Sequence, residues 1–414
     1  MDEKLTIAKE TLEKYKQEQL LTNYEQMNKI KQEELLNEIL TTNFKKVKEL
    51  FESTKKNNED KDSKIEPIEH ITKDELTKEE YDKYEKIGEK AIKEGKLAVV
   101  TLAGGQGTRL GHTGPKGTFD IGLESHKSIF EILCDNFKRA REMYGICIPW
   151  YIMTSDENND DTVKFFEENN YFDYQKNDVH FFRQGKLPMI DTNGKILLNE
   201  EGMIKQAADG HGGVLNAMRK NGIIYDMKER NIEWIFISGV DNILAKFIDP
   251  IFLGAQIENG YMAASKSVVK AYAEEKVGVF CKRDGKPSVI EYSEISKELA
   301  NALDEKGGFL LGDSNIVNHQ FNIDLLDELS SEKLPYHIAF KKANYLDEDG
   351  NVVIATEPNA YKFEAFIFDI FEYVSKMLVF RVKREEEFAP IKNAEGKDSP
   401  ATAKKLYEDF YNIK

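Results

Sequence analysis

The pattern of apolar and polar residues changes near residue 95. Upstream, Leu36, Leu40, Phe44, Val47 and Phe51 recur at helical spacing and mark one apolar helix face among Glu and Lys residues. Downstream, short apolar runs alternate with amphipathic helices, which is typical of a largely parallel sheet. We therefore predict an α/β protein. It has a Rossmann-like mixed, mostly parallel central sheet flanked by helices, with a helical N-terminal segment and a small C-terminal lobe.

Several individual elements can be predicted. Thr77 and Glu80 form a capping box, which starts a helix that should end near Gly95. A second helix should carry apolar residues on one side, namely Ile129, Leu133, Phe137, Ala140 and Tyr144. Strands are predicted at residues 97–102, 150–154, 179–182 and 234–238, and a hairpin at 278–292 around Asp284-Gly285.

These elements suggest three consecutive regions. Residues 1–95 form a helical N-terminal region, residues 96–360 a central domain and residues 361–414 the small C-terminal lobe. Within the first region, residues 54–64 contain no apolar side chain and are predicted to be a flexible link.

Composition and charge narrow the function classes. The chain has 414 residues, is 40% hydrophobic and carries a formal charge of -16, so we expect no nucleic-acid partner. No apolar stretch approaches a membrane span, and the first 16 residues are too charged for a secretory signal, so we expect no membrane partner. Cys134, Cys147 and Cys281 are widely spaced, which suggests neither a disulfide framework nor a zinc site and favours a cytoplasmic location.

The most informative segment follows the first predicted strand. The strand runs into Gly104-Gly105-Gln106-Gly107-Thr108-Arg109, and Pro115-Lys116-Gly117 comes soon after. Glycines directly after a strand let backbone N–H groups surround an anionic group, because no Cβ blocks the approach. Arg109 and Lys116 add positive charge. The segment therefore predicts a triphosphate site rather than a simple glycine-rich turn.

The spacing differs from those of two common phosphate loops. Leu110 stands where a dinucleotide fingerprint requires its third glycine, which disfavours a dinucleotide oxidoreductase. A Walker A loop requires Gly-Lys-Ser/Thr, whereas Lys116 lies between Pro115 and Gly117.

A carboxylate follows another predicted strand. Residues 234–238 are succeeded by Gly239-Val240-Asp241-Asn242, which places Asp241 at a carboxyl end, where open α/β sheets bind ligands. Mg²⁺ is often held by one or two carboxylates plus phosphate oxygens, so one Asp suffices. An Asx turn or a helix N-cap is the structural alternative.

The order Leu102-x-Gly104-Gly105-x-Gly107-Thr108-Arg109-Leu110, followed by Pro115-Lys116, resembles the signature of sugar nucleotidyltransferases. With Gly122-Leu123-x-Ser125-x-Lys127-Ser128-Ile129-Phe130 it resembles the eukaryotic-type UDP-N-acetylglucosamine pyrophosphorylases. The resemblance covers nearly the whole chain and is strongest at the loop and at residues 388–394. It implies that residues 96–360 are a catalytic domain that makes a UDP-sugar and pyrophosphate from UTP and a hexose 1-phosphate, with Mg²⁺.

The resemblance also implies roles for single residues. It assigns catalysis to Arg109, Lys116 and Lys362, and Mg²⁺ binding to Asp241. It assigns nucleotide binding to Leu102, Ala103, Gly104, Gly105, Gln184 and Gly210. It assigns sugar binding to His211, Glu291, Asn315, Phe366, Phe368 and Lys392.

The chemistry of these side chains suits such roles. The Gln184 amide presents both a donor and an acceptor, as the paired edge of uracil requires, and Glu291 and Asn315 suit vicinal hydroxyls. Structural alternatives exist for each: a surface residue at Gln184, an exposed strand residue at Glu291, a turn at Asn315 and a solvated cation at Lys362. Phe366 and Phe368 are two apart, as on one strand face, so core packing is their alternative role.

One position departs from the family pattern. The acetylhexosamine enzymes usually carry Asn where this chain has His211, whereas glucose-type relatives often carry His. N-acetylglucosamine 1-phosphate leads on overall similarity to the family, and His211 keeps glucose 1-phosphate or a broad sugar specificity as the alternative. A catalytically silent nucleotide-sugar sensor is a further alternative, from a different class.

Overall fold

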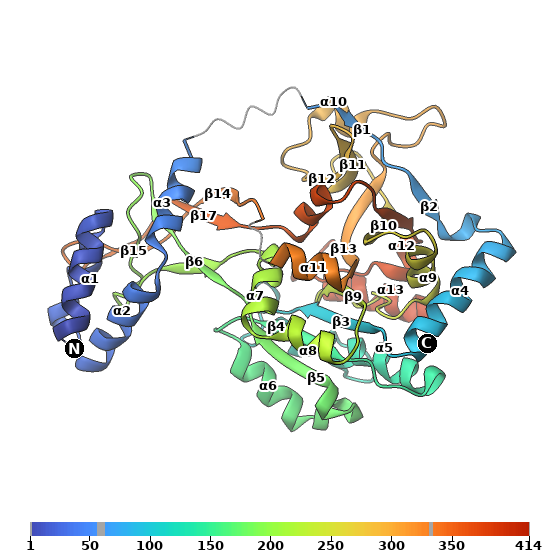
Figure 1. The fold of residues 1–414 in the computed structure, drawn as a ribbon, viewed down its shortest axis with the longest axis horizontal. Helices are drawn as coiled ribbons and strands as arrows, with labels where there is room; N and C mark the ends of the chain where they lie inside the picture. The colour runs from blue at the N-terminus through green and yellow to red at the C-terminus, as the bar shows by residue number, and fades with distance from the viewer. Residues whose placement is uncertain (1, 56–62, 331–333, 414) are drawn as a thin grey trace. The chain divides into compact units, whose positions relative to one another are not determined.

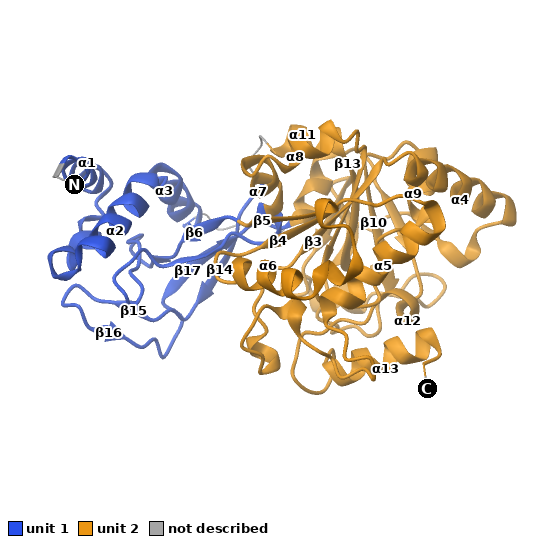
Figure 2. Ribbon diagram, turned by 90° about the horizontal axis from the view of Figure 1, so that it is seen from below, with its two compact units in different colours: residues 1–62, 185–213, 334–366 blue, residues 63–184, 214–333, 367–414 orange. Residues whose placement is uncertain are grey.

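The computed structural model describes residues 2–55, 63–330 and 334–413. The chain folds into two compact units, each assembled from separated segments (Figure 2). Unit 1 comprises residues 1–62, 185–213 and 334–366, and unit 2 comprises residues 63–184, 214–333 and 367–414. Most of the predicted phosphate-binding chemistry belongs to unit 2.

Unit 2 contains all strands of the central sheet, and the labelled ones can be followed in Figure 1. Its strands are β1 Ile65–Glu66, β2 His70–Thr72, β3 Leu97–Leu102, β4 Trp150–Thr154, β5 Val179–Arg183, β9 Trp234–Gly239, β10 Ala263–Val269, β11 Val279–Arg283, β12 Lys286–Ile290, β13 Asp313–Asn322 and β18 Leu378–Arg381. Its helices are α4 Lys78–Lys93, α5 Ile129–Tyr144, α6 Asn159–Glu168, α7 Val214–Lys220, α8 Ile223–Glu229, α9 Pro250–Glu258, α10 Lys297–Asn301, α11 Ile323–Ser330, α12 Arg384–Glu387 and α13 Pro400–Tyr411.

The main path of the sheet runs β2-β18-β10-β13-β9-β3-β4-β5. Every neighbouring pair on this path is parallel except those of β13, which pairs antiparallel with β10 and with β9. The carboxyl ends of β3, β4, β5 and β9 therefore meet at one edge, where ligands of open α/β sheets bind. The mixed, mostly parallel sheet that we predicted is confirmed.

Burial explains why these segments are strands and helices. The β3, β4 and β9 runs are nearly continuous apolar sequences covered by helices on both faces of the sheet (Figure 2). On one face, Phe137 of α5 stacks on Trp150 of β4 with ring centroids 4.6 Å apart, and Trp150 Nε1 donates to Thr101 Oγ1 at 2.8 Å. The scaffold under the strand ends is thus densely packed.

Several predicted elements are confirmed. The capping box of Thr77 and Glu80 begins α4, and α5 spans the predicted helix. β3 and β4 have the predicted bounds, whereas β5 and β9 each extend one residue further. β11 and β12 form the predicted hairpin, in which Asp284 and Gly285 both adopt positive φ angles.

Unit 1 combines N-terminal helices with small sheets. Its elements are α1 Asp2–Tyr15, α2 Lys29–Thr41, α3 Phe44–Ser53, β6 Lys186–Pro188, β7 Ile190–Asp191, β8 Gln206–Ala208, β14 His337–Lys341, β15 Tyr345–Leu346, β16 Val352–Val353 and β17 Ala360–Glu364. The sheets pair as β14-β17-β7, β6-β8 and β15-β16. Leu12, Leu36 and Phe44 from the helices share one core with Leu198 and Phe363.

The apolar face predicted across residues 36–51 is not one continuous helix. The chain breaks after α2, and the side chain of Asn43 accepts from Lys46 N at 3.0 Å to begin α3. Leu36 and Phe44 are buried, whereas Leu40, which lies in α2 with Leu36, is exposed. Of the predicted link at 54–64, residues 56–62 lie outside the described part of the chain.

The two units also differ from the three consecutive regions that we predicted. Residues 63–95 lie in unit 2 with the central sheet, and residues 185–213 lie in unit 1 with the N-terminal helices. From residue 367 the chain lies in unit 2, where β18 pairs with β10 and β2. Pairing between strands distant in the sequence is the physical reason, since periodicity identifies a strand but not its neighbours.

Candidate functional site

The glycine segment after β3 is held in a defined loop. Gly107 N donates to Gly114 O at 3.0 Å, and Lys116 N donates to Gly105 O at 3.1 Å. Asn158 Nδ2 donates to Ala103 O at 2.9 Å and to Gly105 O at 3.2 Å. Asn158 is buried, and sequence reasoning missed it because its partners lie more than fifty residues away. Its amide fixes the start of the loop to the end of β4.

Gln184 lies directly over this loop. It follows β5, and its backbone N donates to Thr154 O at 2.8 Å. A Cβ on Gly104 would lie 2.7 Å from the Gln184 side-chain amide, so the close approach requires glycine. The structure thus brings together Gly104 and Gln184, while Leu102 and Ala103 bond to the neighbouring strand ends: Val240 N donates to Leu102 O at 3.1 Å and Ala103 N donates to Met153 O at 2.8 Å.

Predicted charged residues gather beside the loop. Lys116 Nζ lies 3.8 Å from Asp241 Oδ2, and both side chains are partly buried. Burial lowers the pKa of Lys116; Asp241 opposes this, while the positive charges of Lys392 and Arg109 lower it further. Three cations and one carboxylate therefore share one region of a protein whose formal charge is -16. Such a concentration of positive charge suits a polyanionic ligand.

The segment that carries Lys392 is bonded to the Asp241 turn. Ile391 N donates to Asp241 O at 2.9 Å. Asn242 Nδ2 donates to Glu387 O at 2.8 Å, and Asn242 Oδ1 accepts from Ala389 N at 2.9 Å. Asp241 and Lys392 are thus brought together by backbone and amide bonds between segments nearly 150 residues apart.

The Asp241 carboxylate fits a metal held chiefly by phosphate. Within residues 2–55, 63–330 and 334–413, no three His, Cys, Asp or Glu side chains gather as a protein metal cage requires. Asp241 offers a partly exposed carboxylate, a hard oxygen ligand, beside cations that would bind the same phosphates. Mg²⁺ commonly binds through one or two carboxylates plus substrate phosphates, so the residues are compatible with it.

Glu291 and Asn315 approach each other around Gly278. Asn315 N donates to Gly278 O at 2.8 Å, and a Cβ on Gly278 would lie 2.8 Å from Glu291 Oε1. Asn315 Oδ1 accepts from Val317 N at 2.9 Å. Val317 has a φ of 55°, which is strained for a β-branched residue and occurs where the β10–β13 register shifts. Strain of this kind is often found at functional sites.

Four further predicted residues lie in unit 1. Gly210 has a φ of 86°, and a Cβ there would lie 2.3 Å from Ala365 O. His211 stacks on Phe366 with ring centroids 5.2 Å apart. Lys362 Nζ pairs with Glu364 Oε1 at 2.8 Å. Unit 1 therefore gathers Gly210, His211, Lys362 and Phe366.

Phe366 and Phe368 do not lie on one strand face. β17 ends at Glu364, and Ile367–Tyr373 forms a 3-10 helix, so the two-residue spacing does not place the rings side by side. Phe368 is buried and belongs to unit 2, whereas Phe366 belongs to unit 1. The sugar contacts assigned to both remain predictions.

Asp209 is a buried acid that the sequence did not single out. Its carboxylate fills the space that Cβ atoms would occupy on Gly185 and Gly213, which lie in the same unit. Among the described residues, Oδ1 has no hydrogen-bond partner. Burial raises the pKa of Asp209 to about 6, although Lys46 opposes this. The flanking glycines are therefore required by the packing of one side chain.

Together, the fold and site define a nucleotide-binding α/β protein with a cationic glycine loop at the carboxyl edge of its sheet. The family model described as UTP–glucose-1-phosphate uridylyltransferase matches residues 40–399, and the chain belongs to this family. None of the described helices has the length and apolar character needed to cross a membrane.

Named relatives are similar over most of the chain. The UDP-N-acetylhexosamine pyrophosphorylase-like protein 1 of Mus musculus is 40% identical over 78% of this chain and 66% of its own length. The UDP-N-acetylglucosamine pyrophosphorylase of Saccharomyces cerevisiae is 43% identical over 78% of this chain and 70% of its own. The chain thus spans about two thirds of the length of these curated relatives.

A solved structure agrees with the fold. The uridine diphosphate N-acetylglucosamine pyrophosphorylase of Trypanosoma brucei, crystallised with an inhibitor, has a TM-score of 0.82 and 29% identity. The match covers 98% of this chain and 84% of that one.

Proposed function

We propose that this protein is a uridylyltransferase that forms UDP-N-acetylglucosamine and pyrophosphate from UTP and N-acetylglucosamine 1-phosphate. The observation that carries the proposal is the grouping of Arg109, Lys116, Asp241 and Lys392 beside a glycine loop that Gln184 overlies. Family membership and the names of the relatives support the reaction type and the sugar.

The reaction requires positioning and charge stabilisation rather than an activated side chain. An oxygen of the sugar phosphate attacks the α-phosphorus of UTP, and the bond from that phosphorus to the bridging oxygen of pyrophosphate breaks. Both reactants are polyanions, so the barrier falls mainly by holding them together in line. Arg109, Lys116 and Lys362 would stabilise negative charge on the transferring and leaving phosphates.

The role proposed for Mg²⁺ is to neutralise phosphate charge. Asp241 would hold Mg²⁺, which when bound neutralises charge on phosphate oxygens. Lys116, 3.8 Å from that carboxylate, would bind the same phosphates from the protein side. Backbone N–H groups at Gly104 and Gly105 would contact the nucleotide without hindrance from a Cβ.

Recognition would divide between base and sugar. Gln184 and Gly210 would select uracil. The sugar phosphate would be positioned by a second set of residues: His211, Glu291, Asn315, Phe366, Phe368 and Lys392. The ring stacking of His211 on Phe366 supports a shared role for these two residues in unit 1.

A pyrophosphate-release assay tests the proposal. The protein is incubated with UTP, MgCl₂ and, separately, N-acetylglucosamine, N-acetylgalactosamine, glucose and galactose 1-phosphates. We expect the highest kcat/KM with N-acetylglucosamine 1-phosphate and loss of release when EDTA is added. Faster release with glucose 1-phosphate would favour the glucose-type alternative indicated by His211. Absence of release with every sugar would contradict the enzyme proposal and favour a nucleotide-sugar sensor.

A further inference from the structure

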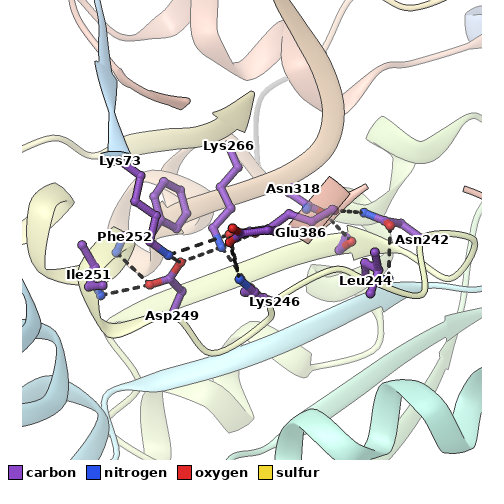
Figure 3. A network of polar contacts seen from close by, with 12 residues as sticks. Lys73, Asn242, Leu244, Lys246, Asp249, Ile251, Phe252, Lys266, Asn318 and Glu386 are labelled. Carbon is purple, nitrogen blue, oxygen red and sulfur yellow. Dashed lines mark hydrogen bonds and ion pairs between the residues drawn. The ribbon is translucent and has the colours of Figure 1, made fainter. Parts of the chain in front are cut away.

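A network of polar contacts joins the buried residues Lys266 and Asp249 and extends to Asn242 (Figure 3). Lys266 of β10 is fully buried, and its Nζ lies 2.6 Å from Glu387 Oε2 and 2.8 Å from Asp249 Oδ2. Asp249 Oδ1 in turn accepts from Ile251 N at 3.1 Å and caps α9. Lys266 thus joins the N-terminus of α9 to residue 387, which is more than a hundred positions away.

Two more lysines form ion pairs with acidic residues of this charged group or next to it. Lys73 Nζ lies 3.2 Å from Asp249 Oδ2, and Lys246 Nζ lies 3.4 Å from Glu386 Oε2. Burial alone would raise the pKa of Asp249, but Lys266 and Lys73 hold it below its usual range. Ion pairs buried this deeply add little net stability compared with apolar packing. Their best-attested use is to fix one arrangement of the chain.

Asn242 connects the charged group to the functional site. Its amide bonds the backbone of the Glu387 segment at two points, Glu387 O at 2.8 Å and Ala389 N at 2.9 Å. The side chain of Glu387 is meanwhile held by Lys266. The segment that begins at Glu387 is therefore fixed both through its backbone, by Asn242, and through the Glu387 side chain, by Lys266.

The bonds continue to the predicted ligand-binding residues. Ile391 N donates to Asp241 O at 2.9 Å, and Lys392 follows directly. Asn242, Glu387 and Lys266 are each no more than 3% exposed, so they can influence a ligand only through other residues. The Asp241 side chain, in contrast, is partly exposed, and its Oδ2 lies 3.8 Å from Lys116 Nζ.

We propose that Asn242, Glu387 and Lys266 form a positioning unit that fixes Lys392 beside Asp241 and Lys116. The inference rests on the proposed function, because it assigns the three residues to placing the cation that receives the sugar phosphate. It also makes a structural claim that holds without turnover: the amides of Ala389 and Ile391 are protected only while Asn242 holds the segment.

The kinetic test is a double-mutant cycle in the full chain. Asn242→Ala should raise KM for the sugar 1-phosphate by about tenfold, and KM for UTP much less. Lys392→Ala should show the same split. The double variant should be no worse than Lys392→Ala, because the amide acts through that lysine. Additive losses would overturn the proposal.

A matched control separates positioning from general stability. Asn259→Ala removes amide bonds to Ala255 O and Tyr84 Oη at the far end of α9, and it should leave both KM values unchanged. Glu387→Gln is the second variant if Asn242→Ala does not fold. It replaces the carboxylate that pairs with Lys266 by a neutral amide, so the buried ion pair is lost. It should produce the same KM split, and normal kinetics in it would overturn the proposal.

Hydrogen exchange distinguishes this inference from the proposed function. In Asn242→Ala the amides of Ala389 and Ile391 should exchange at least about tenfold faster than in the wild type, with helix α5 unaffected. Unchanged exchange at both amides would overturn the inference even if the enzyme is active. A wild-type protein that releases no pyrophosphate would contradict the function but leave the exchange result decisive for the positioning unit.

Discussion

Lys116 lies in the middle of the charged cluster, with its Nζ 3.8 Å from Asp241 Oδ2. Removing its charge should affect phosphate chemistry much more than folding, because burial already disfavours the charged form. We expect Lys116→Ala to lower kcat by about 10²–10³-fold and to change the melting temperature by less than about 2 °C. Pyrophosphate release and calorimetry measure the two quantities.

The control for this prediction is Lys96→Ala. Lys96 pairs with Glu233 at 2.8 Å at the amino end of β3, away from the loop. Its loss should leave kcat unchanged. Near-normal turnover of Lys116→Ala would remove Lys116 from the mechanism.

The two glycines after Ala103 should respond differently to substitution. A Cβ on Gly104 would lie 2.7 Å from the Gln184 side chain, whereas a Cβ on Gly105 meets no described protein atom within 4 Å. Gly104→Ala should therefore displace Gln184 and weaken UTP binding while also lowering the melting temperature. Gly105→Ala should weaken UTP binding only, because only a bound nucleotide would meet the new methyl group. Titration calorimetry and thermal unfolding distinguish the two, and equal UTP affinity in wild type and Gly105→Ala would contradict the loop assignment.

Asp209 makes stability depend on pH. Its pKa is raised to about 6 in the folded protein from an ordinary value of 3.8, so the folded state binds more protons between these values. Stability therefore falls as pH rises through this window, by at most about 3 kcal/mol for a difference of this size. Asp209→Asn should raise the free energy of unfolding at pH 8, and the gain should vanish near pH 4.

Asp313 provides the opposite case as a control. Burial would raise the pKa of its carboxyl, but hydrogen bonds from His70 and Arg381 lower it to about 2. Its contribution is present above its unfolded pKa and is lost as pH falls toward about 2. Asp313→Asn should thus destabilise the protein at pH 8. A gain for Asp209→Asn that is equal at pH 4 and pH 8 would contradict the assignment of the raised pKa.

At the scale of elements, helices α4 and α9 pack so closely that their backbones touch. A glycine on each helix, Gly88 and Gly254, makes this contact possible. A Cβ on Gly254 would lie 1.8 Å from Tyr84 O, and a Cβ on Gly88 would lie 1.8 Å from Pro250 O. Backbone atoms cannot move as a side chain can. Gly254→Ala should therefore lower the free energy of unfolding by about 3 kcal/mol. Denaturant unfolding tests this, with Lys86→Ala on the exposed side of α4 as the near-neutral control; a loss below about 0.5 kcal/mol would contradict it.

The sequence predicted whether a segment is a helix or a strand more readily than it predicted which other segments that helix or strand contacts. β3 and β4 were predicted to the residue because their apolar runs are bounded by Gly, Pro and polar residues. The break at Asn43 was missed because Leu40 and Phe44 continue the helical spacing on either side of it. Phe366 and Phe368 were misplaced for a similar reason, since a spacing of two does not exclude a 3-10 helix.

The candidate site could be predicted in part. The loop and Asp241 follow apolar strands directly, so their position at the sheet edge is readable from local sequence. Asn158, Asn242 and Asp209 could not be found that way, because each acts on backbone or glycines that only the fold brings near. A buried polar residue that supports a site leaves no periodic signal.

At the scale of the whole molecule, the candidate site is positively charged although the protein as a whole is negatively charged. The chain carries 74 acidic and 58 basic side chains, yet Arg109, Lys392 and Asp241 all lie close enough to Lys116 to shift its pKa. The interleaving of segments into two units could not be predicted from composition, because it depends on contacts between segments that lie far apart in the sequence. Each unit nonetheless gathers predicted ligand-binding residues of its own.

The central claim is that residues 104–116 bind a triphosphate beside Asp241 and Lys392. A crystal structure of the full chain with UTP and Mg²⁺ tests it most directly. We expect the phosphates along this loop, the metal on Asp241 and the uracil against Gln184. A bound UTP that leaves residues 104–116 uncontacted, or a metal away from Asp241, would contradict it.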